Sequence, residues 1–166
     1  NEINKLKING VVVIGEGEMD AAPRLYIGEK LGFGGDISVD IAVDPLDGTK
    51  LAAENKPNAV SVIAISNSNC FLRAPDMYME KISVGPELPN NIINLDDPLT
   101  KNIERLAKAK KKDIINIKVC LLYRPRHKKQ IYILKNMNCK LKLISDGDVV
   151  GAMQASLHDS DVDMYL

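Results

Sequence analysis

The sequence has no surplus of charge of either sign, few cysteines and no long apolar segment. Twenty-two Lys and Arg residues balance twenty-two Asp and Glu residues, so no overall field favours nucleic acid or an anionic membrane as a partner. Cys70, Cys120 and Cys139 are odd in number and lack metal-ligand spacing, which favours reduced thiols in a cytoplasmic protein over a disulfide framework. No signal-peptide core or membrane-length apolar run is present, so we expect no membrane partner.

The length and the distribution of charge suggest one domain with two roles. The 166 residues, 45% of them hydrophobic, suffice for a single compact core. Fourteen basic residues lie between Lys101 and Lys142, with only Glu104 and Asp113 as acids among them, although a solvated helix face accounts for most of these lysines. We expect a single domain over 1–166, with a metal-binding half at 1–96 and a substrate-binding half at 97–166.

Hydrophobic patterning in the first half predicts strands that deliver acids at their carboxyl ends. Val11–Ile14 is a short apolar run closed by glycine, and Ser38–Asp44 alternates before Pro45, which we expect to end the strand. Helical spacing predicts a helix over Ala21–Leu31. Two further runs, 59–65 and 70–73, predict an antiparallel hairpin.

The second half predicts strand, loop and helix units. Asp97 and Pro98 suit the start of a helix that ends at Lys110–Lys112, and its apolar face carries Leu99, Ile103, Leu106 and Ala107. The elements that follow are a strand at 116–122, a helix at 128–136, a strand at 140–144 and a helix after Asp148. Such units imply parallel strands, whose carboxyl ends place the intervening polar loops at one edge of the sheet, where ligands bind.

Two acidic motifs dominate the first half, Gly15-Glu16-Gly17-Glu18-Met19-Asp20 and Asp44-Pro45-Leu46-Asp47-Gly48-Thr49. Five carboxylates close together require cations to neutralise them, and two divalent cations between carboxylates suit phosphate-ester hydrolysis. The first motif fits an exposed acidic turn equally well, and its glutamates argue against a dinucleotide fingerprint. The second does not fit a calcium loop, because its twelfth position is Asn55.

Further polar residues suit a phosphorylated ligand. Gly48 and Thr49 would present backbone N–H groups to a phosphate, and the Thr49 hydroxyl could orient the attacking water. Arg124-Pro125-Arg126-His127 carries two guanidinium groups that match phosphate oxygens, but surface arginines at a turn fit equally well; His127 is a bystander. Asp146-Gly147-Asp148 suits either sugar hydroxyls or a helix-capping turn. Tyr78 suits either the ligand or a protein core.

Taken together, these segments closely resemble the class II, GlpX-type fructose-1,6-bisphosphatases. The resemblance rests on motifs that follow one another in the family's order: Val13–Asp20, Leu25–Lys30, Asp40–Pro45, Ala74–Lys81, Arg124–His127 and Asp146–Asp148. In some lineages these bacterial enzymes also hydrolyse sedoheptulose 1,7-bisphosphate. The family is similar to the lithium-sensitive, metal-dependent phosphatases, so the resemblance implies an α/β fold, a layered alpha/beta sandwich.

The resemblance also implies roles for individual residues. Glu16, Asp44 and Asp47 would hold Mn²⁺ or Mg²⁺, and Asp20 and Thr49 would be catalytic. The implied contacts to the sugar bisphosphate are Asp47, Gly48, Thr49, Tyr78, Arg124, Pro125, Arg126, Asp146, Gly147 and Asp148. The products would be fructose 6-phosphate and phosphate, a step of gluconeogenesis or of the reductive pentose phosphate cycle, catalysed by a cytoplasmic homodimer or homotetramer.

This chain departs from the family in three respects. Asp47 stands where the family usually has glutamate, a change that metal binding should tolerate. Family members begin upstream with a segment that supplies a further aspartate, and they continue past Leu166 to a metal-binding glutamate. We therefore expect a central portion of such an enzyme. A remnant that binds metal or sugar phosphate without turnover is the alternative, and a phosphatase acting on another ester, such as an inositol phosphate, is disfavoured by the two arginines.

Overall fold

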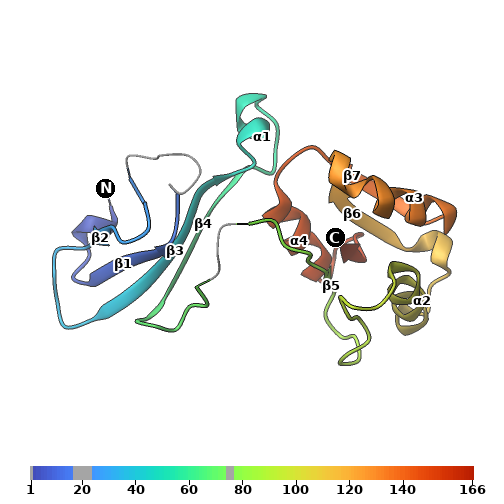
Figure 1. Cartoon of the computed structure of the whole chain (residues 1–166), viewed down its shortest axis with the longest axis horizontal. Helices are drawn as coiled ribbons and strands as arrows, with labels where there is room; N and C mark the ends of the chain where they lie inside the picture. Colours follow the sequence, from blue (N-terminus) through green and yellow to red (C-terminus); the bar gives the residue numbers. More distant parts are fainter. Residues whose placement is uncertain (1, 17–23, 74–76) are drawn as a thin grey trace. The chain divides into compact units, whose positions relative to one another are not determined.

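A computed structural model describes residues 2–16, 24–73 and 77–166, which divide into two compact units (Figure 1). Unit 1 comprises Asn1–Asp47 and Val60–Tyr78, and unit 2 comprises Gly48–Ala59 and Met79–Leu166. Each unit has its own four-stranded sheet with parallel and antiparallel pairs. The α/β class is therefore confirmed. The expected division into a metal-binding half at 1–96 and a substrate-binding half at 97–166 does not coincide with these two units, and it stays a proposal.

The sheet of unit 1 has the order β2-β1-β3-β4. Its strands are β1 (Asn9–Ile14), β2 (Lys30–Leu31), β3 (Ser38–Asp47) and β4 (Val60–Asn67), preceded by the 3-10 turn η1 (Ile3–Lys5). β1 and β3 are parallel, whereas β2 and β4 run antiparallel to their neighbours. The buried core of this unit is a cluster of four residues, Val12, Leu31, Val39 and Ile41.

The helix expected over Ala21–Leu31 is wrong for its described part, 24–31. The backbone there pairs with β1 instead: Val12 N–H donates to the Glu29 carbonyl, and Gly28 N–H donates to the Val12 carbonyl. Gly28 has a φ of +92°, a conformation that a helix does not contain and that glycine adopts at little cost. Pairing along the edge of β1 therefore overrides the helical spacing of these side chains.

Two other expectations for unit 1 are corrected by the pairing of β3 with β4. Pro45 does not end β3, because the strand continues to Asp47 through a register shift between Asp44 and Asp47; a bulge tolerates the missing N–H of proline. The 59–65 run forms β4, but 70–73 does not form the second strand of a hairpin. The antiparallel partner of β4 is β3, with Ile41 opposite Ile65.

The sheet of unit 2 has the order β5-β8-β6-β7. Its strands are β5 (Ser83–Val84), β6 (Lys118–Leu122), β7 (Lys140–Ile144) and β8 (Met164–Tyr165), and its helices are α1 (Thr49–Ala53), α2 (Leu99–Lys110), α3 (Lys128–Asn136) and α4 (Asp148–Ser156). Two 3-10 turns, η2 (Ile114–Asn116) and η3 (Pro125–His127), lie on either side of β6. β6 and β7 are parallel, which confirms the predicted succession of strand, loop and helix. The bounds of α3 and β7 are also those predicted. β6 begins two residues later than expected.

Helix α2 confirms the predicted apolar face but not the predicted cap. Ile103, Leu106 and Ala107 are buried in a cluster of ten core residues. Pro98 occupies the N-cap position, and no side chain caps the helix. The Asp97 carboxylate binds Lys101 Nζ at 2.7 Å and Arg105 Nη1 at 2.5 Å; the hydrogen bond from Lys101 lowers the pKa of Asp97 most. The Asp97 carboxylate thus pairs with side chains of α2 instead of capping the helix.

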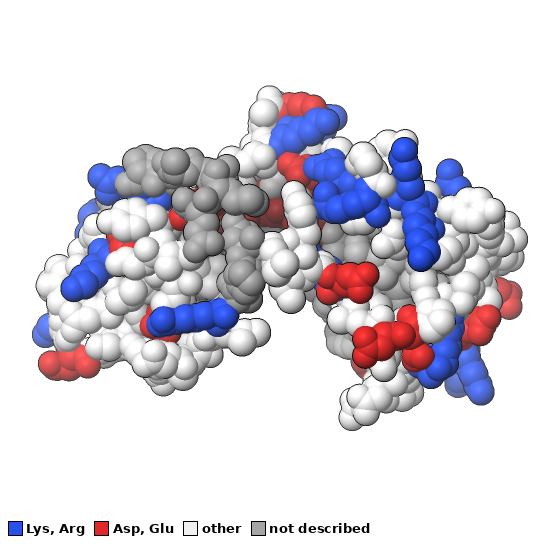
Figure 2. All heavy atoms as spheres, in the orientation of Figure 1, with Lys and Arg blue, Asp and Glu red and all other residues white. Residues whose placement is uncertain are grey.

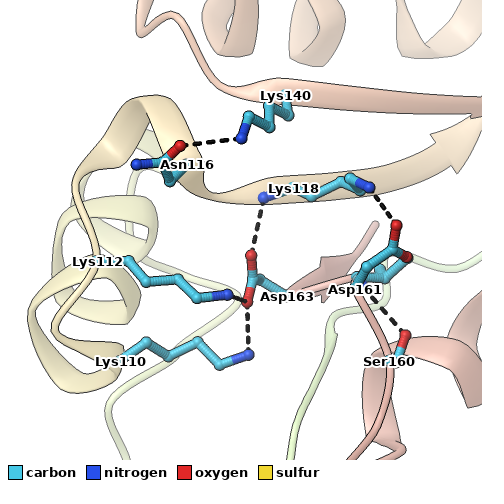
Figure 3. A network of polar contacts seen from close by, with 9 residues as sticks. Lys110, Lys112, Asn116, Lys118, Lys140, Ser160, Asp161 and Asp163 are labelled. Atoms are coloured by element: carbon cyan, nitrogen blue, oxygen red, sulfur yellow. Dashed lines mark hydrogen bonds and ion pairs between the residues drawn. The ribbon is translucent and has the colours of Figure 1, made fainter.

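A buried carboxylate joins three segments of unit 2 (Figure 3). Asp163, with 1% of its side chain exposed, accepts hydrogen bonds from Lys110 Nζ at 2.6 Å and Lys112 Nζ at 2.7 Å. Its other oxygen accepts the Lys118 backbone N–H at 2.9 Å. Asp163 thereby connects the end of α2 and the start of β6 to the residue that precedes β8. A buried charge with three donors of this kind fixes the position of each segment.

Positive and negative side chains are mixed on the surface of the molecule. Figure 2 shows both signs interspersed, with basic side chains more numerous over the part of unit 2 that carries α1, β7 and α3.

All three cysteines are free, and burial raises the pKa of the Cys120 and Cys139 thiols. Among residues 2–16, 24–73 and 77–166, no helix has the length and apolar character that a membrane span needs.

Candidate functional site

The predicted metal-binding aspartates lie on one strand of unit 1. In β3, Asp44 is opposite Val62 of β4 and Asp47 is opposite Val60. Val60 and Val62 are two positions apart and face the same side of the sheet, so their partners do too. The bulge thus turns Asp47 to the side of Asp44, which an uninterrupted strand would not do. Asp44 Oδ1 accepts the Leu46 N–H at 3.0 Å, and this contact holds the bulge.

The third predicted ligand, Glu16, comes from a different segment of unit 1. It follows β1, is half-buried and forms an isolated bridge with Tyr26. In the part of the chain that the structure describes, no group of three or more His, Cys, Asp or Glu residues is arranged to hold a metal ion. The described carboxylates therefore do not form a complete site for a divalent cation. Asp20, the predicted catalytic acid, lies outside the described residues.

The Gly48 turn belongs to unit 2, directly after Asp47. Gly48 is buried and adopts a left-handed φ of +83°, which permits the sharp turn between β3 and α1. Thr49 and Lys50 open α1 and are exposed. The Lys50 N–H donates to Asp146 Oδ2 at 2.9 Å, so this first-turn N–H has a protein acceptor. The turn that carries Thr49 is therefore held by Asp146.

The arginine loop follows β6 at the carboxyl edge of the unit 2 sheet. Arg124 is half-buried, and its Nη2 lies 3.4 Å from Asp146 Oδ1. Pro125 and Arg126 are exposed on η3. His127 Nδ1 lies 2.7 Å from the Leu122 carbonyl oxygen; because that oxygen only accepts, Nδ1 carries the proton. His127 thus holds the loop against β6, and the expectation that it is a bystander in the chemistry stays a prediction.

The loop that follows β7 brings a second set of predicted residues to the same edge. Gly147 is buried, has a φ of +79° and occupies the N-cap position of α4, so no side chain caps this helix. Asp148 is the first residue of α4, where a carboxylate is favoured by the helix dipole, and it binds Lys81 Nζ at 2.8 Å. Asp146 does not cap α4, because its oxygens face Lys50 and Arg124.

Two participants were missed by sequence reasoning. Lys81 neutralises Asp148, and the Lys50 backbone N–H holds Asp146, but the partners are 67 and 96 residues apart. No local spacing could have indicated either contact. Lys81 does end a segment that carries the family resemblance, which was the available signal.

The position of Tyr78 excludes one of its two predicted roles. It belongs to unit 1, and 78% of its surface is exposed. The core alternative is therefore wrong, and a contact with ligand stays a prediction.

A shallow hollow lies beside the Gly147 turn within unit 2. Its volume is about 250 Å³, and its lining includes Leu51, Lys56, Asn58, Ile144, Asp146 and Gln154. This volume is below the range of about 300–1,000 Å³ typical of small-molecule pockets. The hollow has room for a group the size of a phosphate.

The structure thus groups the predicted residues by unit. Unit 1 contains Glu16, Asp44, Asp47 and Tyr78; unit 2 contains Gly48, Thr49, Arg124, Pro125, Arg126, Asp146, Gly147 and Asp148. In unit 2, a double-arginine loop and two glycine turns lie beside neighbouring parallel strands. Guanidinium groups beside strand ends are typical of proteins that bind phosphorylated ligands. The fold and these loops define an α/β protein with a candidate site for a phosphorylated ligand.

Comparison with known proteins identifies the family. Residues 1–166 match the family described as "Bacterial fructose-1,6-bisphosphatase, glpX-encoded", and the chain belongs to this family. It is 44% identical over 162 residues to fructose-1,6-bisphosphatase 1 class 2 of Escherichia coli (strain K12), covering 98% of this chain and 48% of that protein. The class 2 fructose-1,6-bisphosphatase of Haemophilus influenzae gives the same identity and coverage. The chain spans about half the length of these curated relatives.

Proposed function

We propose that this protein hydrolyses the 1-phosphate of fructose 1,6-bisphosphate and releases fructose 6-phosphate and phosphate. The observation that carries the proposal is the family match along all 166 residues. Relatives that are 44% identical are named fructose-1,6-bisphosphatases. The arrangement of unit 2 supports the proposal, because Arg124 and Asp146 follow neighbouring parallel strands.

The proposed roles in unit 2 follow from charge and backbone geometry. Arg124 and Arg126 bind the phosphate that is not cleaved, since the guanidinium fork matches two phosphate oxygens. The Gly48 turn places Thr49 beside the phosphate that leaves. Asp148 accepts hydrogen bonds from sugar hydroxyl groups, while Lys81 offsets its charge and limits repulsion of the phosphates.

We also propose that the activity depends on a divalent cation, Mn²⁺ or Mg²⁺, held with the help of Asp44 and Asp47. Glu16 is the expected third ligand. When bound, such a cation would polarise a phosphoryl oxygen. The support for this pair is that Asp44 and Asp47 face the same side of β3.

The test is phosphate release from fructose 1,6-bisphosphate, with and without added Mn²⁺ or Mg²⁺. Asp44→Asn should lower turnover by about a hundredfold or more, because the amide cannot neutralise a cation. Asp36→Asn is the matched control, since Asp36 is an exposed carboxylate of the same unit, and it should keep wild-type turnover. Robust phosphate release in excess chelator would contradict the proposed dependence on metal.

Location and assembly remain predictions. We propose a cytoplasmic protein that assembles as a homodimer or homotetramer. Size-exclusion chromatography with light scattering at several protein concentrations tests the assembly, and a monomer throughout that range would contradict it.

A further inference from the structure

Two glycine turns of unit 2 lie in direct contact. A Cβ atom added to Gly48 would lie 3.5 Å from the Gly147 Cα atom, and one added to Gly147 would lie 3.0 Å from the Asn58 carbonyl oxygen and from Leu51 Cδ1. Both glycines have left-handed φ angles, +83° and +79°. The turn that opens α1 and the turn that opens α4 are therefore in van der Waals contact, and a side chain at position 147 would crowd Asn58 and Leu51.

Asp146 connects these turns to the arginine loop. Its Oδ2 accepts the Lys50 N–H at 2.9 Å, and its Oδ1 lies 3.4 Å from Arg124 Nη2. The Asp146 side chain is 21% exposed, so most of it lies within the protein. One carboxylate thus contacts the segment that carries Thr49 and the segment that carries Arg124, both inside unit 2.

These contacts argue against sugar binding as the main task of Asp146. Each Asp146 oxygen faces a protein donor, which leaves only its second lone pair for a sugar hydroxyl group. Asp148 makes a useful comparison, since it pairs with a lysine side chain, Lys81, which is half exposed. A lysine can turn away from a carboxylate at low cost, whereas a backbone N–H cannot.

We infer that Asp146 is a positioning residue: it holds the Gly48–Lys50 turn and the Arg124 guanidinium in fixed relation to one another. The consequence for catalysis rests on the proposed function, because it requires Thr49 and Arg124 to act on the two phosphates of one substrate. Misplacing reacting groups relative to a bound substrate lowers the rate of the chemical step. Loss of Asp146 therefore lowers kcat, and not only the affinity for substrate.

The first arm of the test does not depend on activity. Amide hydrogen exchange of Lys50 is measured by NMR in the wild type, Asp146→Ala, Asp146→Asn and the control Asp159→Ala, which removes an exposed carboxylate of the same unit. Loss of a hydrogen bond to a charged acceptor should speed Lys50 exchange about tenfold or more in Asp146→Ala. Asp146→Asn keeps one acceptor oxygen, so its Lys50 exchange rate should lie between those of the wild type and Asp146→Ala. The rate in Asp159→Ala should match that of the wild type.

The second arm measures kcat and KM for fructose 1,6-bisphosphate. Asp146→Ala should lower kcat about tenfold or more, with partial rescue in Asp146→Asn, whereas loss of a simple substrate contact would raise KM at unchanged kcat. Wild-type exchange at Lys50 in a folded Asp146→Ala protein, or a rise in KM alone, would overturn the inference. If the wild type releases no phosphate, the proposed function fails, while the exchange experiment still decides whether Asp146 holds the turn. Thermal melts of each variant separate these effects from global unfolding.

Discussion

The two units of this protein differ sharply in how much apolar surface they bury. Among the described residues, sixteen buried hydrophobic residues belong to unit 2 and five to unit 1, although unit 2 is only about one and a half times as long. The largest core cluster of unit 2 has ten buried members, against four in the cluster of unit 1. Hydrophobic burial is the main source of folding stability, so unit 2 should be the more stable part.

Unit 1 also leaves large apolar side chains of its sheet exposed. Its strand β4 is at the edge of the sheet, and Ile63 and Ile65 on it are each 50% exposed. The residues opposite them, Val43 and Ile41, belong to the better buried side of β3. Regions with few buried apolar contacts open locally at lower free energy. The proposed metal ligands are thus on the less stable unit, and the proposed phosphate-binding loops are on the more stable one.

The largest effect should come from truncating a core side chain in unit 2. Leu106→Ala should lower the free energy of unfolding by about 4 kcal/mol, and Ile41→Ala in unit 1 by about 2 kcal/mol, because a small cluster collapses around a cavity more easily. Both side chains are fully buried, so the pair is matched. Urea unfolding followed by circular dichroism measures both, and equal losses would contradict the difference between the two cores.

A somewhat smaller loss should follow removal of the buried charge in unit 2. Asp163→Asn should cost about 2–3 kcal/mol near neutral pH, less than for a fully buried pair, because Lys110 and Lys112 can partly return to water. Burial alone raises the pKa of Asp163, but the hydrogen bonds from Lys110, Lys112 and the Lys118 N–H together lower it. The measurement is again urea unfolding, with the exposed Asp159→Asn as the control.

The pH dependence of that variant has a defined sign. Because the pKa of Asp163 is lower in the folded state, its contribution is present above the unfolded-state pKa of about 3.9 and is lost as pH falls through the folded-state value. The difference in stability between the wild type and Asp163→Asn should therefore shrink below about pH 4. A difference that grows in acid would show that the lysines do not stabilise the ionised carboxylate.

Close packing within unit 2 should reverse the usual effect of replacing a helical glycine. Gly151 lies inside α4, where alanine normally stabilises by about 1 kcal/mol. A Cβ atom there would lie 2.6 Å from Tyr165 Cε2, on a buried ring, so we expect Gly151→Ala to destabilise by about 1–2 kcal/mol. Met153→Ala, at an exposed site of the same helix, is the control and should change thermal stability little. A more stable Gly151→Ala protein would show that α4 and β8 can separate freely.

The smallest effect should appear at the edge of unit 1. Ile63→Thr keeps a β-branched residue at a half-exposed position and should change the free energy of unfolding by less than about 0.5 kcal/mol. Val39→Thr, buried in the same sheet, should cost about 1–2 kcal/mol, since its hydroxyl enters the core. Chemical denaturation of the two proteins compares them, and an equal, large loss for Ile63→Thr would mean that this edge is covered in solution.

Prediction from sequence succeeded where local pattern and structure depend on the same residues. Helix α3 and strand β7 have the predicted bounds, and the apolar face of α2 is the buried one. The polar loops after β6 and β7 lie at one edge, because parallel strands joined by a helix bring their carboxyl ends together. The family was also identified from motifs, and the comparisons confirm it.

Prediction failed where a distant partner determined the local structure. Residues 24–31 have helical spacing, yet they pair with β1, and 70–73 has strand-like composition without a strand partner. Asp97 suits a helix cap, but Lys101 and Arg105 hold its carboxylate. For the candidate site, the roles of the residues stay predictions, and no local pattern indicated the bulge that brings Asp44 and Asp47 to one side of β3.

The amino-acid sequence by itself determined the α/β class, the family and the order of the polar loops, because these depend on short motifs and on the periodicity of neighbouring residues. Only the tertiary structure decided that β2 replaces a helix, that β3 continues past Pro45, and that Asp146 binds the Lys50 backbone 96 residues away. The physical reason is that strand pairing and hydrogen bonding between distant segments can outweigh local preferences of about 1 kcal/mol or less per residue.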